Sequence, residues 1–89
     1  NPKEIDEIVS KCKGVRESFT IGAPDILYGE DIHTFLLTDD FFDLKELKKY
    51  CRINMQKNYI PSNFYLLINF PRTSSGKISL TALKELASN

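Results

Sequence analysis

Residues 64–87 read FYLLINFPRTSSGKISLTALKELA and contain a strand pattern, a polar loop and a helix pattern in succession. The apolar run at residues 64–70 is typical of a strand. The last helix begins after its cap, Ser79, and we expect its inward side chains to be Leu80, Leu83 and Leu86 or Ala87. The loop at residues 71–77 therefore connects a sheet to a helix.

This loop, PRTSSGK, is suited to presenting one cation to an anionic ligand. Gly76 can take backbone angles that are closed to other residues, and small residues let a backbone approach a ligand closely. Lys77 carries a compact positive charge on a long stem. We therefore expect Lys77 to meet a phosphate or carboxylate that another part of the protein holds. The residues that we expect to shape the turn beside it are Pro71, Thr73, Ser74, Ser75 and Gly76. For Thr73, Ser74 and Ser75 a direct contact with the ligand is the alternative.

A phosphate-binding P-loop is a tempting interpretation of the same residues, and two positions exclude it. That motif needs a glycine where Pro71 stands and a serine or threonine where Ile78 stands. Proline also lacks the backbone N–H that would bind a phosphate. For Arg72 we expect a solvated side chain, with a phosphate or carboxylate contact as the alternative.

The N-terminal half of the chain predicts a helix followed by two strands. Asn1 caps the helix and Gly14 ends it. One strand covers residues 15–22, and a second, nearly all apolar or β-branched, covers residues 32–38. Their short connection, which turns at residues 23–25, predicts antiparallel pairing. Three side chains of the first strand are expected on one side: Val15, Phe19 and Ile21.

A second long helix begins after the cap Asp43 and runs to about Lys57. Its apolar stripe comprises Leu44, Leu47, Cys51 and Met55. The order of elements predicts an α+β fold in which a small three-stranded, mainly antiparallel sheet packs with about three helices.

The titratable side chains outside the loop have structural interpretations. Cys12 and Cys51 are predicted to be buried, reduced thiols of a cytoplasmic protein rather than a disulfide. His33 lies within a strand and is expected to be structural. Asp25 and Glu30 are expected to be turn and capping groups. With one histidine and two distant cysteines, the sequence predicts no metal site.

Size and charge limit what the chain does alone. Its 89 residues make one domain, too small to wall a deep substrate pocket, so we expect a site completed by another domain. Twelve basic and twelve acidic residues balance, which argues against nucleic acid or an anionic membrane as a partner. The apolar runs are too short for a transmembrane helix.

Several short motifs occur in a set order along nearly the whole chain: NPKEID at residues 1–6, VRESFTIG at 15–22, PD at 24–25, GE at 29–30, CR at 51–52, YIP at 59–61, FPRTSSGKI at 70–78, and Leu83. In this order they resemble the C-terminal domain of the acyl-adenylate-forming superfamily, which includes acyl-CoA synthetases, peptide-synthetase adenylation domains and luciferase.

The resemblance implies that residues 1–89 are the C-terminal catalytic lid of an ATP-dependent ligase, whose large N-terminal domain and hinge lie outside this chain. Such enzymes use ATP with magnesium, bound mainly by the N-terminal domain, to convert a carboxylic acid into an acyl-adenylate. The acyl group then passes to the thiol of CoA or of a carrier protein's pantetheine. By alignment Lys77 is the adenylation residue, where its charge offsets the repulsion between carboxylate and α-phosphate. The isolated chain is then expected to be inactive.

A basic stripe on the second long helix has two interpretations. Its members are Lys45, Lys48, Lys49 and Arg52. The stripe is either a solvated helix face or a landing site for CoA phosphates or an acidic carrier protein. Within the superfamily, the loop residues 73–78 resemble acyl-CoA synthetases, with a carrier-loading adenylation domain as the alternative. A non-catalytic α+β interaction module is the alternative from another class.

Overall fold

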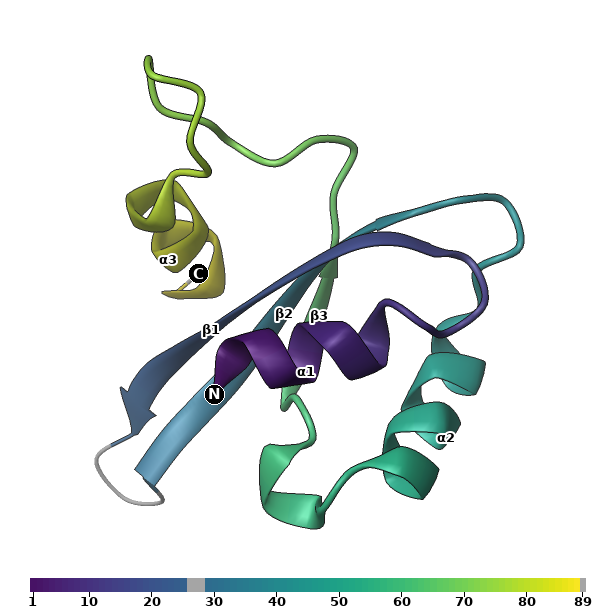
Figure 1. Cartoon of the computed structure of the whole chain (residues 1–89). Helices are drawn as coiled ribbons and strands as arrows, with labels where there is room; N and C mark the ends of the chain where they lie inside the picture. The colour runs from purple at the N-terminus through teal and green to yellow at the C-terminus, as the bar shows by residue number, and fades with distance from the viewer. Residues whose placement is uncertain (26–28, 89) are drawn as a thin grey trace.

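The computed structural model describes residues 1–25 and 29–88. Within this part, residues 23–25 and 29–30 are described as backbone only. The described residues form three helices, a 3₁₀ turn and three strands. The elements, in chain order, are α1 (Pro2–Val9), β1 (Val15–Asp25), β2 (Gly29–Thr38), α2 (Leu44–Asn54), η1 (Lys57–Tyr59), β3 (Asn63–Leu66) and α3 (Leu80–Ser88). This arrangement confirms the predicted α+β class (Figure 1).

The three strands form one sheet in the order β1-β2-β3. β1 and β2 pair antiparallel, as predicted, and this pair is the larger part of the sheet. β3 pairs parallel with β2, from His33 opposite Asn63 to Leu36 opposite Leu66. The parallel direction follows from the connection, because the chain crosses through α2 before it returns to the sheet.

Three predicted strand limits are wrong: the end of β1, the start of β2 and the end of β3. The hairpin strands continue through the turn expected at residues 23–25, since Ala23 pairs with Asp31 and Asp25 with Gly29. The connection at residues 26–28 and the side-chain roles expected of Asp25 and Glu30 lie outside the described residues. β3 ends at Leu66 rather than at residue 70, because the chain leaves the sheet and buries its next aromatic residue, Phe70, elsewhere.

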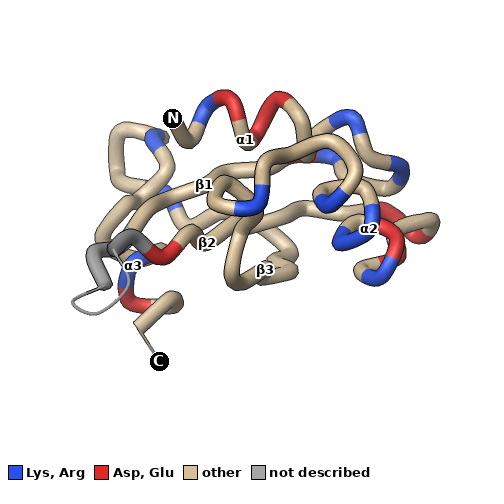
Figure 2. The backbone as a smooth tube through the Cα atoms, turned by 90° about the horizontal axis from the view of Figure 1, so that it is seen from below, with Lys and Arg blue, Asp and Glu red and all other residues tan. Residues whose placement is uncertain are grey.

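Successive residues of β2 supply two separate cores, because adjacent side chains of a strand point to opposite faces. Phe35 and Leu36 are both fully buried. The first core, around Leu36, contains Ile5, Val9, Cys12, Leu47 and Cys51. The second core, around Phe35, contains Ile21, Phe70 and Leu83. The sheet therefore separates a layer made of α1 and α2 from a layer made of α3 (Figures 1 and 2).

The expectation that Val15 shares a side with Phe19 and Ile21 is wrong. Val15 packs against the first core, whereas Phe19 and Ile21 belong to the second. The cause is a shift of register between Val15 and Glu17, which reverses the alternation of side chains at the start of β1.

The helix ends also differ from the prediction. α1 is capped by Asn1 as expected but ends at Val9, five residues before Gly14. Gly14 has φ +87°, and a Cβ there would lie 2.6 Å from the Phe42 nitrogen, so glycine is required where these two segments cross. α2 is capped by Asp43 and ends at Asn54 rather than near Lys57.

Only part of the predicted inward face of α3 is buried. Leu83 is fully buried and Ala87 packs against the second core. Leu80 and Leu86 are 50% and 42% exposed. The prediction was therefore wrong for Leu80, and of the two alternatives at the end of the helix Ala87 is correct.

Polar side chains join α1 to the sheet. The Asp6 carboxylate accepts bonds from Ser18 Oγ (2.7 Å), Thr20 Oγ1 (2.6 Å) and Thr20 N (3.1 Å). Thr20 Oγ1 also lies 2.8 Å from the Oγ1 of Thr34, which is fully buried. On the opposite face His33 Nδ1 lies 2.9 Å from the Tyr65 hydroxyl, in keeping with the structural role expected of this histidine.

Among residues 1–25 and 29–88, none of the helices combines the length and the apolar character needed to cross a bilayer.

Candidate functional site

The loop that carries Lys77 is a closed hairpin, here called the lysine hairpin and comprising residues 71–79. At its base Ser79 N donates to the Pro71 carbonyl (2.8 Å). Nearer the tip Thr73 N donates to the Lys77 carbonyl (2.7 Å), and Gly76 N donates to the Thr73 carbonyl (2.9 Å). Gly76 has φ +90°, the left-handed conformation that such a turn requires and that glycine adopts without strain.

Apolar residues anchor the base of the lysine hairpin on the body of the domain. Phe70 belongs to the second core, and Ile78 packs against that core from the other arm. Ser79 then caps α3, since its Oγ accepts from Ala82 N at 3.2 Å. The hairpin therefore leaves the body at a fixed point, and Figure 1 shows it extending away from the sheet above α3.

The tip of the hairpin is polar, and its residues 72–77 are all exposed. Within the tip, Thr73 Oγ1 and Ser75 Oγ lie 3.0 Å apart. The guanidinium of Arg72 is exposed, as predicted, yet it is bonded: Nη1 donates to the Gly76 carbonyl at 2.9 Å. The hairpin thus offers the cation of Lys77 but builds no wall around a ligand.

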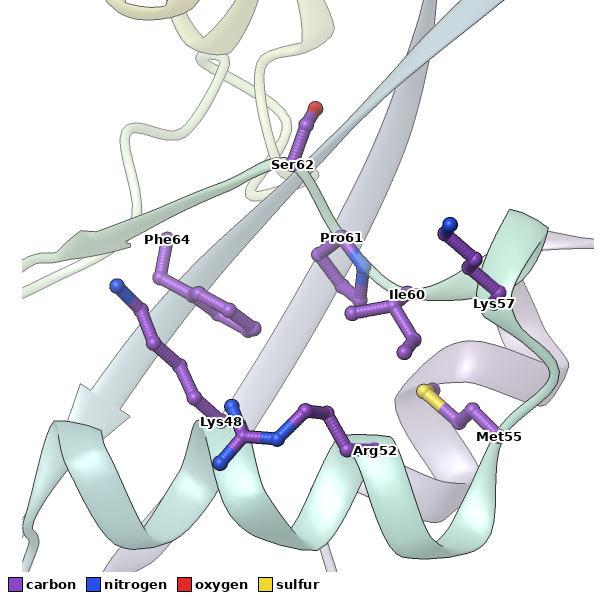
Figure 3. A pocket seen from close by; sticks show the side chains of 8 residues that line it. All are labelled: Lys48, Arg52, Met55, Lys57, Ile60, Pro61, Ser62 and Phe64. Carbon is purple, nitrogen blue, oxygen red and sulfur yellow. The ribbon is translucent and has the colours of Figure 1, made fainter.

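The basic stripe of α2 is divided between two surfaces. Lys48 and Arg52 line a hollow of about 600 Å³, whose other lining residues are Met55, Lys57, Ile60, Pro61, Ser62 and Phe64. Figure 3 shows Lys48 and Arg52 extending from α2 toward Phe64, with Ile60 and Pro61 beside them. Lys49 lines a different hollow with Phe41 and Ile53. Lys45 precedes Lys48 by three positions, the spacing of neighbours on one helix face.

The hollow beside α2 (Figure 3) combines two kinds of surface. Its cations are Lys48, Arg52 and Lys57, the last contributed by η1 and not singled out in the sequence. Its apolar part comes from Ile60 and Pro61, which precede β3, and from Phe64 within β3. This combination suits a ligand with an anionic group attached to an apolar or ring-shaped body.

The hollow and the lysine hairpin lie at different ends of the domain. Figure 1 places α2 at one end of the sheet and the hairpin with α3 at the other. The two helices of the first layer differ in charge: α1 carries one lysine and three acidic residues, whereas α2 carries four basic residues and one glutamate (Figure 2). A single small ligand does not reach both places on this domain alone.

The two thiols are free and buried, as predicted. Burial raises the pKa of Cys51 to about 11, and the neighbouring Cys12 adds to this effect. Burial also raises the pKa of Cys12, with a smaller contribution from the negative charge of Glu46. Both groups are therefore poor nucleophiles at neutral pH. Within the described residues, no three His, Cys, Asp or Glu side chains gather as metal ligands.

Residues 4–77 match the family described as the AMP-binding enzyme C-terminal domain. A 2-succinylbenzoate–CoA ligase of Listeria monocytogenes is 36% identical over 84 residues, which are 94% of this chain and 18% of the relative.

Solved structures agree with this match. The o-succinylbenzoate CoA synthetase of Bacillus subtilis, in complex with its acyl-adenylate intermediate, superposes with a TM-score of 0.79 at 30% identity, covering 93% of this chain and 17% of that one. A fatty acyl CoA synthetase of Mycobacterium tuberculosis gives 0.82 at 28% identity, covering 98% of this chain and 18% of that one. The chain therefore spans less than a fifth of the length of these relatives.

Proposed function

The chain belongs to the AMP-binding enzyme C-terminal domain family, and on that basis we propose that it is the catalytic lid of an ATP-dependent carboxylate–CoA ligase. The observation that carries the proposal is the lysine hairpin, which falls within the matched residues and presents Lys77 at an exposed tip. A large N-terminal domain of the same protein supplies the cleft that the hairpin enters. Reduced, free thiols at Cys12 and Cys51 support a cytoplasmic location.

Lys77 acts in the first step. A carboxylate oxygen bonds to the α-phosphorus of ATP while the bond from that phosphorus to the bridging oxygen breaks, and pyrophosphate leaves. Two anions must approach each other in this step, and a cation between them lowers the barrier. ATP and magnesium are held by the large domain in this proposal, because the described part of this chain offers no cluster of metal ligands.

Lys48 and Arg52 serve the second step, in which the acyl group passes to a thiol. Their cations line a hollow that also has apolar walls, and CoA carries phosphates beside an adenine ring. Lys45 lies on the same helix face and extends the positive charge. Lys49 lines the other hollow and contributes least to this contact. A carrier protein's pantetheine is the alternative acceptor, and competition between free CoA and a loaded carrier distinguishes the two.

The acid is proposed from the names of relatives alone. Several of them are 2-succinylbenzoate–CoA ligases, and others act as oxalate–CoA or sulfoacetate–CoA ligases. We propose 2-succinylbenzoate as the first acid to test, followed by oxalate, sulfoacetate and a fatty acid.

Acid-dependent exchange between ATP and labelled pyrophosphate tests the proposal in the full-length protein. We expect Lys77→Ala to lower exchange by about a hundredfold or more, the effect typical of removing a preorganised charge or donor. Lys84→Ala is the matched control, because Lys84 is an exposed lysine of α3 outside the hairpin. Equal exchange in the Lys77→Ala and Lys84→Ala variants would remove the basis for a catalytic lid.

A further inference from the structure

The two peptide groups on either side of the Lys77 Cα are both held by hydrogen bonds. The carbonyl of Lys77 itself accepts from Thr73 N at 2.7 Å. The carbonyl of Gly76, which belongs to the peptide group preceding Lys77, accepts from Arg72 Nη1 at 2.9 Å. Together these bonds set the direction in which the Lys77 side chain leaves the backbone.

The second of these bonds comes from a side chain, and it adds to the backbone bond in which Gly76 N donates to the Thr73 carbonyl at 2.9 Å. Glycine has the greatest backbone freedom of any residue. A Cβ at Gly76 would find no atom within 4 Å, so the side-chain direction of Gly76 faces open space and offers no packing to hold this residue. Rotation of the peptide group after Gly76 would redirect Lys77, and the guanidinium of Arg72 opposes that rotation.

The sheet-like pairing of the hairpin arms explains why Arg72 can do this. Arg72 forms an antiparallel bridge with Ile78, which places the two residues opposite each other below the tip. From there the long side chain reaches up to the Gly76 carbonyl. A guanidinium has five N–H donors in a rigid fork, so it can keep this bond while remaining in water.

We propose that Arg72 is a positioning residue that fixes the approach of Lys77 during adenylation, an inference that rests on the proposed function. Catalysis through a single charge depends on where that charge stands, and a misplacement of about 1 Å can cost on the order of a hundredfold in rate. Arg72 acts through the peptide group between Gly76 and Lys77 and touches no substrate in this proposal.

The test is a double-mutant cycle in the full-length protein with the acid that supports pyrophosphate exchange. Arg72→Met removes the donor and keeps the stem, and we expect it to lower exchange roughly tenfold to a hundredfold. Arg72→Lys, which keeps one donor on a flexible stem, should recover part of this loss. In the Lys77→Ala background, Arg72→Met should cause little further loss, because a residue that acts through Lys77 has nothing left to position.

A second readout separates positioning from damage to the fold. Thioester formation from acyl-adenylate supplied directly, with CoA, should be nearly unchanged by Arg72→Met, since Lys77 serves the first step. Full exchange in Arg72→Met would overturn the inference and leave the lid function standing if Lys77→Ala is still defective. An equal loss with and without Lys77 would overturn it too, because Arg72 would then act on the substrate directly. No loss in Lys77→Ala would remove the lid function and this inference together.

Discussion

Two glycines with nearly the same backbone angle should differ sharply when each is replaced by alanine. Gly14 has φ +87° and Gly76 has φ +90°. An alanine forced into this region costs about 1–2 kcal/mol at either position. Alanine also reduces the freedom of the unfolded chain, which offsets about 0.4–1 kcal/mol. From backbone angle alone, both variants should lose about 1 kcal/mol.

The two variants should differ in stability because the space around the new methyl group differs between the two positions. At Gly14 a Cβ would lie 2.6 Å from Phe42 N and 2.8 Å from Phe42 Cβ, and it would also overlap the Phe42 Cα. The obstacle is mainly backbone, which cannot rotate away, so an overpacking cost of about 1–3 kcal/mol is added. At Gly76 nothing lies within 4 Å. We therefore expect Gly14→Ala to lower the free energy of unfolding by about 2–4 kcal/mol and Gly76→Ala by about 1 kcal/mol.

Thermal unfolding of residues 1–89, followed by circular dichroism, measures both effects. In a domain of this size 1 kcal/mol corresponds to a shift in Tm of roughly 4–8 °C. In the full-length protein we expect Gly76→Ala to lower pyrophosphate exchange more than Gly14→Ala does, because Gly76 lies beside Lys77 and Gly14 lies far along the chain from it. Equal Tm shifts in the two variants, or a larger shift in Gly76→Ala, would show that contact with Phe42 does not determine the outcome.

Three further predictions concern the partly buried polar contact of Asp6, the thiol of Cys51 and the hollow beside α2. Asp6→Ala should lower the free energy of unfolding in urea by about 3 kcal/mol, because a carboxylate that accepts three hydrogen bonds is lost. Glu7→Ala is the control, and an equal loss of unfolding free energy in the two variants would contradict this prediction. The raised pKa of Cys51, about 11 against an ordinary 9.0, favours the folded state below pH 9.0, and this contribution is lost as pH rises toward 11. Unfolding midpoints at about pH 8 and pH 10 should therefore differ more in the wild type than in Cys51→Val, and equal differences would refute the assignment. Arg52→Glu in the full-length protein should raise the KM for CoA about tenfold without changing exchange, whereas Lys84→Glu should change neither; an unaltered KM would exclude a contact to CoA.

Local signals in the sequence were sufficient for the helix starts. Asn1 and Asp43 each accept a bond from the backbone N–H two residues ahead, as their capping roles require. The apolar stripe, comprising Leu44, Leu47, Cys51 and Met55, was predicted correctly for the same reason, since such a stripe depends only on helical spacing. The parallel pairing of β3 and the displaced Val15 depend on partners far along the chain, so no local pattern contained them.

The site shows the same division between local and distant effects. Position and composition predicted a loop around Lys77, and the structure has a hairpin there with Gly76 in the left-handed conformation. The hollow beside α2 needed tertiary structure, because Lys57 comes from η1 and Phe64 from β3. The contact of Asp6 with Ser18 and Thr20 was not predicted from the sequence. Ser18 and Thr20 occupy alternate positions on one strand, which could have suggested a polar partner on the facing helix.

The lysine hairpin has its own internal hydrogen bonds and is anchored to the domain at its base, a combination that fits the proposed role of carrying a charge into a neighbour's cleft. Its internal bonds run between its own residues, from Pro71–Ser79 at the base to Arg72–Gly76 near the tip. Phe70 and Ile78 hold the base in the second core, so a movement of the body carries the tip with it. A lysine on a floppy loop would lose conformational entropy each time it became ordered against the substrate. In the proposed lid, the backbone part of that cost is met during folding, so only the side chain of Lys77 has to become ordered against the substrate.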